Sequence, residues 1–373
     1  MSTILWITWK DYGHPEAGGA EVVARELTAR LCADGHAVTM LTCGYPGAPA
    51  QGQLGGVRVI RVGSSRYLHP FQAFGYYVRH LRGRFDIVIE EVNGAAPYFC
   101  VLFEHRARRF LLYHQLGRKN WLYEVPAPFG RLGYHILAPA ATRLASLSGV
   151  PVITVSASTR AALAKHGFGP SRTHIISEGI QLQPLPSLAA VHKYDRPTCL
   201  CLGAMRAMKR TLDQVKAFEI AKQRLPGLQL KIAGSAAGAY GRQVLSYARR
   251  SPYAADITYL GHVSAADKLA LLRQSHVILQ TAVEEGWGLT ITEAAAQGTP
   301  AVAYDVAGLR DSIRHQQTGL TTAENPASLA EAIVRLLTAR NFYEQCRRAA
   351  WQWSRHITFQ QSYQDFTRIV GLA

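Results

Sequence analysis

Hydrophobic and polar positions along the chain follow two alternating periods. Short runs rich in apolar residues, such as 4–9, 36–43 and 277–281, are typical of buried strands. Between such runs lie segments such as 20–35 and 209–224, whose apolar residues recur every three or four positions, as they do on one face of a helix. This regular exchange of strand and helix predicts parallel, doubly wound α/β sheets.

The exchange stops once, at residues 182–197, and then begins again. This stretch contains three prolines and is typical of a linker. We therefore expect two similar α/β domains facing a central cleft, residues 1–181 before the linker and residues 198–355 after it, with a final helix in residues 356–373. A chain of 373 residues exceeds what one hydrophobic core usually organises, which also favours two domains.

The composition limits the class of protein further. With 48% hydrophobic and 18% charged residues the chain is expected to be globular, and it has no apolar run of the ~18 residues that a membrane span requires. Its first residues lack the basic-then-apolar plan of a signal peptide. The six cysteines show no C-x-x-C spacing and the histidines are scattered, so no metal site is expected. These features favour the reducing cytoplasm.

The formal net charge of +16 is spread over both halves of the chain. Three partners could account for it: nucleic acid, an anionic membrane surface, or an anionic small substrate. No helix-turn-helix, zinc-binding or RNA-binding signature accompanies the charge, so we expect no nucleic acid partner. A basic surface that serves only solubility is the remaining alternative.

Residues 284–302 form the most informative stretch. They follow the apolar run at 277–281, pass through a turn with two glycines at 286–288, and continue with helix-forming residues from Leu289. A helix that begins after such a turn presents unpaired backbone N–H groups and a positive dipole end, which suit a diphosphate. We therefore consider this turn a candidate diphosphate site.

Two carboxylates accompany that turn. Glu285 precedes the helix and Glu293 lies about one turn inside it, where each could accept hydrogen bonds from sugar hydroxyls. The same pattern also fits a structural βα unit whose acidic residues favour the helix dipole. Spacing alone leaves both interpretations open.

Two other segments follow strands at the corresponding edges of the predicted sheets. Gly18 and Gly19 lie between the first strand and the first helix, where a ligand could approach the backbone, although the loop has neither a G-x-G-x-x-G nor a Walker pattern. Arg206 and Lys209 follow the first strand of the second half. Together with residues 286–290 they would form a diphosphate clamp, and the alternative is a solvated helix start.

Five segments resemble, in order and spacing, the motifs of glycosyltransferase family four. The donor-binding motif of that family has two glutamates separated by seven residues and then a glycine and a proline, and it resembles VEEGWGLTITEAAAQGTPAVAYDVAGLRDSI. The other four are AGGAEVVARELTARLCADGHAVTMLT, PVITVSASTRAALAKHGF, LGAMRAMKRTLDQVKAFEIAK and ITYLGHVSAADKLALLRQSHVIL. The resemblance spans nearly the whole chain, and its motifs are highly specific in combination.

The resemblance implies a GT-B fold, in which two Rossmann-like domains hold a nucleotide-sugar mainly through the C-terminal domain and the last helix returns to the N-terminal domain. The catalytic residues that it implies are Glu285, His114, Lys209 and Arg206. The donor-binding residues that it implies are Gly18, Gly19, Arg206, Lys209, Val263, Glu285, Gly286, Trp287, Gly288, Leu289, Thr290 and Glu293. Position alone would make His114 structural, but it matches a family histidine that contacts the donor sugar.

The sequence departs from the family pattern at three places. Ala204 occupies the usual position of a basic residue before Lys209, and Arg206 lies two residues later. Glu178 stands where the family has an asparagine. Trp287 replaces the commoner phenylalanine, which is a conservative aromatic change.

We therefore expect a retaining, metal-independent glycosyltransferase that moves a sugar from a UDP- or GDP-sugar to a hydroxyl of a saccharide or lipid-linked acceptor, in the synthesis of cell-surface polysaccharide or glycoconjugate. No cofactor is expected, because the nucleotide-sugar is a substrate. The alternatives are a transferase for a soluble natural-product acceptor, a nucleotide-sugar epimerase, and a non-catalytic basic binding module.

The acceptor site is expected in the N-terminal domain. Candidate residues are Glu91, Asn93, Arg118 and Trp121. The aromatic and basic residues between 114 and 134, together with the net charge, suggest a cytoplasmic enzyme that associates peripherally with the anionic inner face of a membrane.

Overall fold

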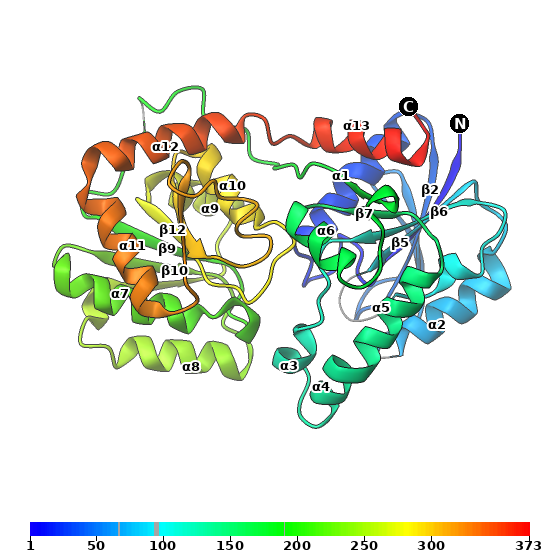
Figure 1. The fold of residues 1–373 in the computed structure, drawn as a ribbon, viewed down its shortest axis with the longest axis horizontal. Coiled ribbons are helices and arrows are strands. Elements are labelled where there is room, and N and C mark those ends of the chain that lie inside the picture. The colour runs from blue at the N-terminus through cyan, green and yellow to red at the C-terminus, as the bar shows by residue number, and fades with distance from the viewer. Residues whose placement is uncertain (66–67, 93–96, 190) are drawn as a thin grey trace. The chain divides into compact units, whose positions relative to one another are not determined.

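The computed structural model describes residues 1–65, 68–92, 97–189 and 191–373 (Figure 1). They form two compact units. Unit 1 comprises Met1–Gly179 and Phe359–Ala373, and unit 2 comprises Ile180–Thr358. Each unit is a Rossmann-like α/β domain built on one mainly parallel sheet, so the predicted fold class is confirmed.

The sheet of unit 1 has the strand order β3-β4-β2-β1-β5-β6-β7-β8. These strands are β1 (Thr3–Ile7), β2 (Ala37–Thr42), β3 (Gln51–Leu54), β4 (Val57–Arg61), β5 (Ile87–Val92), β6 (Arg108–Tyr113), β7 (Val152–Thr154) and β8 (Thr173–Ile175). Only β3 and β4 pair antiparallel. The chain extends to one side of β1 through β2 and to the other side through β5, so the topological switch point lies between β1 and β5.

Helices cover both faces of this sheet. The helices of unit 1 are α1 (Gly19–Ala33), α2 (His69–Tyr76), α3 (Asn120–Glu124), α4 (Phe129–Leu132), α5 (Ala138–Leu147), α6 (Ala157–Ala164) and α13 (Phe359–Val370). Turns of π-helix at Tyr77–Leu81 and Gly133–Leu137 extend α2 and join α4 to α5. Helices α1 and α13 share one core with Trp6, whereas α2 and α5 bury Ala73 and Ala145 on the opposite side.

The sheet of unit 2 has the strand order β11-β10-β9-β12-β13-β14, and all of its pairs are parallel. Its strands are β9 (Thr198–Leu202), β10 (Gln229–Ala233), β11 (Ile257–Gly261), β12 (Val277–Gln280), β13 (Ala301–Tyr304) and β14 (Gly319–Thr322). Its helices are α7 (Thr211–Arg224), α8 (Gly238–Arg249), α9 (Ala265–Gln274), α10 (Leu289–Ala296), α11 (Pro326–Thr338) and α12 (Arg340–Ser354). The switch point of this sheet lies between β9 and β12.

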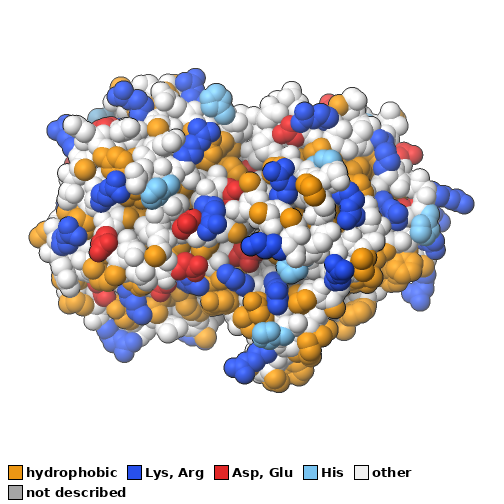
Figure 2. Space-filling view, viewed as in Figure 1, with side chains coloured by type: hydrophobic (Ala, Val, Ile, Leu, Met, Phe, Trp, Pro, Cys, Tyr) orange, Lys and Arg blue, Asp and Glu red, His pale blue; other side chains and the backbone are white. Residues whose placement is uncertain are grey.

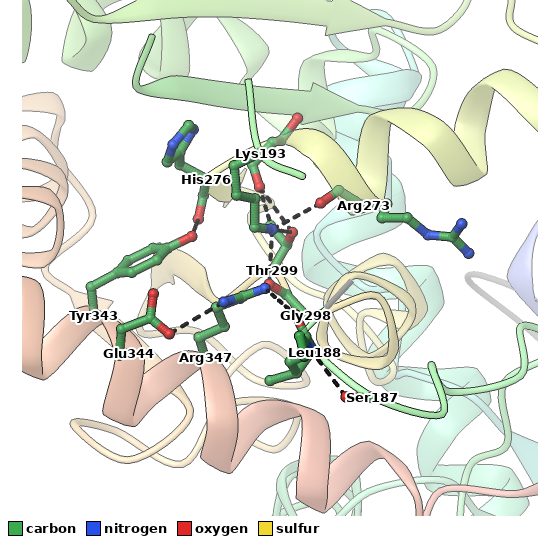
Figure 3. A network of polar contacts seen from close by, with 12 residues as sticks. Ser187, Leu188, Lys193, Arg273, His276, Gly298, Thr299, Tyr343, Glu344 and Arg347 are labelled. Carbon is green, nitrogen blue, oxygen red and sulfur yellow. Dashed lines mark hydrogen bonds and ion pairs between the residues drawn. The ribbon is translucent and has the colours of Figure 1, made fainter. Parts of the chain in front are cut away.

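Residues 182–189 and 191–197 belong to unit 2, and Lys193 attaches this segment to the rest of the unit (Figure 3). Its ammonium group donates hydrogen bonds to the carbonyl oxygens of Arg273, Ser275 and Gly298 at 2.8–2.9 Å and to the hydroxyl of Thr299 at 2.7 Å. Burial, assisted by the nearby Arg347, lowers the pKa of this lysine well below its usual range. Three carbonyl oxygens and one hydroxyl of unit 2 therefore replace the water that would otherwise accept hydrogen bonds from this buried amino group.

Arg347 adds a second attachment for the same segment. From α12 its guanidinium donates to the carbonyl oxygens of Leu188 and Gly298, each at 3.2 Å, and it pairs with Glu344 at 3.2 Å (Figure 3). Gly298 therefore receives a donor from each of the two basic side chains. This shared carbonyl links residues 188–193 to the end of α10.

We predict that Lys193→Met destabilises the protein by about 1–3 kcal/mol, because it keeps the length of the side chain but leaves buried carbonyl oxygens without their donor. Urea unfolding of the variant measures the change in the free energy of unfolding. Lys165→Met, at an exposed lysine, serves as the control for loss of one charge. Equal stabilities of the two variants would contradict this account of residues 182–197.

Candidate functional site

The switch point of unit 2 brings together two residues that the sequence separates by 76 positions. Lys209 lies in the turn after β9, and Glu285 follows β12, the strand next to β9. The ammonium of Lys209 donates a hydrogen bond to Oε1 of Glu285. Both side chains are partly exposed, by 28% and 19%, so this ion pair is accessible to a ligand.

The turn that carries Lys209 is fixed by the end of β12. The hydroxyl of Thr281 donates to the carbonyl oxygens of Lys209 and Arg210 at 2.8 and 3.0 Å, and the backbone N–H of Val283 donates to the carbonyl of Met208 at 2.9 Å. Arg210 adopts a left-handed backbone conformation with φ +48° at the start of α7. These bonds hold that uncommon conformation and thereby fix the position of the lysine.

Helix α10 begins beside this ion pair. Gly288, its N-cap, has φ +94°, which favours glycine, and a Cβ atom there would crowd Leu309 at 3.0 Å from its Cδ2. Among the described residues no side chain caps the helix. The backbone N–H groups of Leu289 and Thr290 therefore have no acceptor within the helix, as a diphosphate site requires.

Gly308, which the sequence analysis did not single out, sets the position of Glu285 from the other side. It has φ +83°, and a Cβ atom there would lie 2.1 Å from the backbone oxygen of Glu285. The backbone N–H of Glu285 donates to the carbonyl of Ala307 at 3.1 Å. The glycine in the sequence VAGLRD was the available signal, because only glycine permits this close approach.

Glu293 is paired with a residue that the sequence analysis also missed. Lys268 from α9 donates to the Glu293 carboxylate at 2.7 Å, and both side chains are partly exposed. Thr290 is held at the first turn of α10 by Gln280, whose amide donates to the threonine hydroxyl at 2.9 Å. Glu285 and Glu293 thus each pair with a lysine of their own.

The remaining predicted residues of unit 2 occupy different surroundings. Arg206 is exposed at the start of the turn that holds Lys209. Val263 is partly buried against the core of the unit. The Trp287 ring lies 6.2 Å from that of Trp353, while its indole Nε1 is buried and has no hydrogen-bond partner in the part of the chain that the structure describes.

The glycine loop of unit 1 lies at the corresponding switch point, after β1. Gly19 begins α1, and the backbone N–H of Gly18 donates to Oε2 of Glu21 at 2.6 Å. Glu21 is buried and lies 3.8 Å from the ammonium of Lys10. Burial raises the pKa of Glu21 despite the opposing charge of Lys10.

His114 and Glu91 form a hydrogen-bonded pair in unit 1. Nε2 of His114, after β6, lies 2.9 Å from Oε1 of Glu91 at the end of β5. Oε2 of the same carboxylate accepts a 2.8 Å hydrogen bond from the indole of Trp6. Glu91 is fully buried, so these two contacts fix its orientation. Asn93, the neighbouring acceptor candidate, lies outside the described residues.

Glu178 brings a further carboxylate close to this histidine. It is only 5% exposed, and within the described ranges its Oε2 has no hydrogen-bond partner. Burial raises the pKa of Glu178 to about 7, opposed by the charge of His114. Burial lowers the pKa of His114, but the hydrogen bond and charge of Glu91, with Glu178 and Glu21 adding to them, outweigh burial and raise it.

Arg118 and Trp121 take part in the packing of the helical segment that follows. The guanidinium of Arg118 donates to the carbonyl of Tyr134 at 2.9 Å and lies 4.3 Å from the centre of its ring. The indole of Trp121 packs on Gly133, where a Cβ atom would lie 1.9 Å from the ring. Both residues therefore hold the chain around α3 and α4.

Comparisons with known proteins agree with this architecture. The family model described as Glycosyltransferase Family 4 matches residues 17–183, and the model described as Glycosyl transferases group 1 matches residues 189–353. The chain is 27% identical, over 91% of its length and 90% of the relative's, to the GDP-mannose-dependent alpha-(1-6)-phosphatidylinositol monomannoside mannosyltransferase of Mycobacterium tuberculosis.

Solved structures share the fold over the whole chain. Sucrose-phosphate synthase from Thermosynechococcus elongatus aligns with a TM-score of 0.79 at 19% identity, covering 99% of this chain and 98% of the other. Anabaena HepE in complex with UDP-glucose aligns with a TM-score of 0.76 at 14% identity, covering both chains completely. The lipopolysaccharide glycosyltransferase WaaG aligns with a TM-score of 0.71 at 15% identity, covering 99% of this chain and all of the other.

The chain belongs to glycosyltransferase family four. Its two Rossmann-like units are those of the GT-B fold, and it is a glycosyltransferase, as the resemblance of its motifs predicted. The comparisons give no support to the epimerase alternative.

We predict that removing either neighbouring carboxylate lowers the pKa of His114, because each favours the protonated imidazole. Glu91→Gln should lower it more than Glu178→Gln, since Glu91 also accepts the hydrogen bond. NMR titration of the His114 ring measures both shifts, with the exposed Glu16→Gln as a control. An unchanged His114 pKa in Glu91→Gln, or a larger shift in Glu178→Gln, would show that the histidine is governed by other groups.

Glu178 should also make stability depend on pH. Its pKa rises from an ordinary 4.5 to about 7 on folding, so the folded protein binds this proton more tightly and loses stability as pH rises between those values. Glu178→Gln removes this loss. We predict that the stability of the variant relative to the natural protein increases from about pH 5 to about pH 8 in urea unfolding. A difference that stays constant with pH would contradict the assignment.

Proposed function

We propose that the protein is a retaining, metal-independent glycosyltransferase that moves a sugar from a UDP- or GDP-sugar to a hydroxyl of a saccharide or lipid-linked acceptor. It would act without a cofactor in the cytoplasm, peripherally on the inner membrane face, in the synthesis of cell-surface polysaccharide or glycoconjugate. The observation that carries the proposal is the Lys209–Glu285 pair beside the uncapped start of α10.

The donor would lie along the switch point of unit 2. Its diphosphate would accept hydrogen bonds from the backbone of Leu289 and Thr290, Glu293 would bind the ribose hydroxyls, and Glu285 would bind the transferred sugar. The base would lie near Val263. Support for both bases comes from relatives: the mycobacterial enzyme is named for GDP-mannose, and Anabaena HepE was solved with UDP-glucose.

The two lysine–glutamate ion pairs suggest the order in which charged groups would exchange partners as the donor binds. An incoming diphosphate would draw the ammonium of Lys209 away from Glu285, because two phosphate groups carry more charge than one carboxylate. Glu285 would then be free to accept hydrogen bonds from the sugar. In the same way, ribose hydroxyls would share Glu293 with Lys268. The pairs would thus orient both carboxylates before the donor arrives.

The chemistry would depend on stabilising the leaving group. As the bond from the anomeric carbon to the diphosphate lengthens, negative charge grows on the phosphate oxygens, where Lys209, Arg206 and the α10 N-terminus would stabilise it. The acceptor hydroxyl would attack from the same face of the sugar and give its proton to the departing phosphate. This route retains the anomeric configuration and requires no separate base.

Unit 1 would supply the acceptor side and His114. The pair of His114 with Glu91 would present a positively charged, oriented imidazole to sugar hydroxyls. Residues proposed for the acceptor are Glu91, Asn93, Arg118 and Trp121. Gly18 and Gly19 would admit the donor diphosphate close to the backbone at the start of α1.

We predict that Glu293→Ala weakens binding of the donor nucleotide by about 1–3 kcal/mol, because the ribose loses a charged hydrogen-bond acceptor. A thermal-shift panel of UDP-, GDP-, ADP- and dTDP-sugars first identifies the base, and isothermal titration calorimetry with that nucleotide then compares the variants. Glu331→Ala, at an exposed glutamate on α11, is the matched control. Unchanged affinity in Glu293→Ala, or stabilisation by none of the nucleotides, would refute the proposed donor site.

A further inference from the structure

The segment from α4 to α5 has an inverted distribution of side chains. Its large apolar residues point outward, and Phe129, Leu132, Ile136, Leu137, Leu144 and Leu147 are each 45–68% exposed. Small residues fill the buried side instead, namely Gly130, Gly133, Ala138, Thr142 and Ala145. A helix of a soluble protein normally turns its large apolar residues toward the core. Here most of them recur at helical spacing as one outward stripe.

The apolar surface continues over α2. Leu68 and Phe71 are 56% and 76% exposed, and α2 packs through Ala73 in the same core as α5. Figure 2 shows hydrophobic side chains gathered over the region that α2, α4 and α5 occupy in Figure 1. We define the outer apolar surface as Leu68, Phe71, Phe129, Leu132, Ile136, Leu137, Leu144 and Leu147.

The two sequence segments that carry this surface contain basic residues and no acidic ones. Residues 35–85 and 125–177, which contain all of its members, include no aspartate and no glutamate. Four arginines on the same helical segments are exposed, namely Arg79, Arg82, Arg131 and Arg143. Acidic residues do occur elsewhere in unit 1, so their absence here is local. An occupant of this surface must therefore be apolar at its centre and anionic at its edge.

We propose that the outer apolar surface docks on an anionic lipid bilayer. The leucines, isoleucine and phenylalanines would enter the boundary between headgroups and acyl chains, and the arginines would contact lipid phosphates. Among the described residues no helix is long and apolar enough to cross a membrane. In the proposed complex the segment would lie in the plane of the interface. The inference rests on the proposed function only in that the membrane would present a lipid-linked acceptor.

Flotation of the full chain with vesicles tests this surface. We expect binding to phosphatidylglycerol–phosphatidylethanolamine vesicles that weakens at high salt, and little binding to pure phosphatidylcholine. The double substitution Leu144→Ser with Leu147→Ser should weaken binding about tenfold or more, since two apolar side chains no longer enter the bilayer. Arg131→Gln with Arg143→Gln should weaken it roughly tenfold as well, and mainly at low salt.

Matched substitutions in unit 2 test whether vesicle binding depends on this surface or only on the total number of exposed apolar and basic residues. Ile220→Ser with Leu260→Ser changes two exposed apolar residues, and Arg242→Gln with Arg249→Gln changes two exposed arginines. Both control proteins should bind the vesicles as the natural chain does. Losses equal to those of the unit 1 variants would overturn the assignment.

Two further measurements distinguish the possible failures. Donor affinity measured by calorimetry should be the same in the Leu144→Ser, Leu147→Ser variant and in the natural chain, because the proposed donor site lies mainly in unit 2. A failure of the membrane proposal can therefore be told apart from a failure of the proposed function. Light scattering without lipid should show no association that these substitutions abolish. A dimer that the same substitutions dissociate would replace the bilayer by a second copy of the chain and refute the proposal, as would vesicle binding that survives them.

Discussion

The ion pair between Lys209 and Glu285 depends on one constraint, the adjacency of β9 and β12 at the point where the chain reverses its direction across the sheet. Parallel strands place their carboxyl ends at one edge, so the turns after these two strands must meet. Hydrogen bonds from Thr281 and Val283 then fix one turn, and the close approach of Gly308 fixes the other. Helix α10 begins beside them, and the proposed chemistry uses both turns and the first turn of this helix.

The same constraint acts in unit 1, where it produces a different result. At the switch point between β1 and β5, Trp6 donates to Glu91, and that carboxylate holds His114, which follows the neighbouring strand β6. The corresponding edge of unit 2 carries lysines and the backbone N–H groups of the first turn of α10, whereas unit 1 carries buried carboxylates and an imidazole whose protonated form they favour. The same fold, used twice, therefore places different chemical groups at the two switch points.

Much of the fold could be predicted from the sequence because buried parallel strands are continuous apolar runs. Strands β3 and β14 were not predicted, because their sequences QGQL and GLTT lie at the edges of the sheets and carry little apolar pattern. The two glycines between β3 and β4, both with positive φ, were the signal for that hairpin. Residues 182–197 were interpreted as a linker because of their prolines. Their attachment through Lys193 could not be predicted, because the acceptors of this lysine lie 80 to 106 positions away in the sequence.

Within the candidate site, the motif at residues 284–302 was predictable because it is local, and its meeting with Lys209 was predictable because both follow strands of one parallel sheet. The turn at Gly288 and the helix that follows it form a local motif, and the structure places them as expected. The partners Lys268 and Gly308 come from other elements, so only the folded sheet reveals them. Likewise, the outward stripe of α4–α5 has the spacing of an ordinary amphipathic helix, and only burial shows which side faces solvent.

The central claim, that the start of α10 and Lys209 hold a nucleotide-sugar diphosphate, is tested most directly by a crystal structure with the UDP- or GDP-sugar that stabilises the protein. The account predicts phosphate oxygens about 2.7–3.2 Å from the backbone nitrogens of Leu289 and Thr290, with the Lys209 ammonium moved from Glu285 to the diphosphate. A ligand bound elsewhere, or a Lys209–Glu285 pair left intact with the diphosphate beyond its reach, would contradict it.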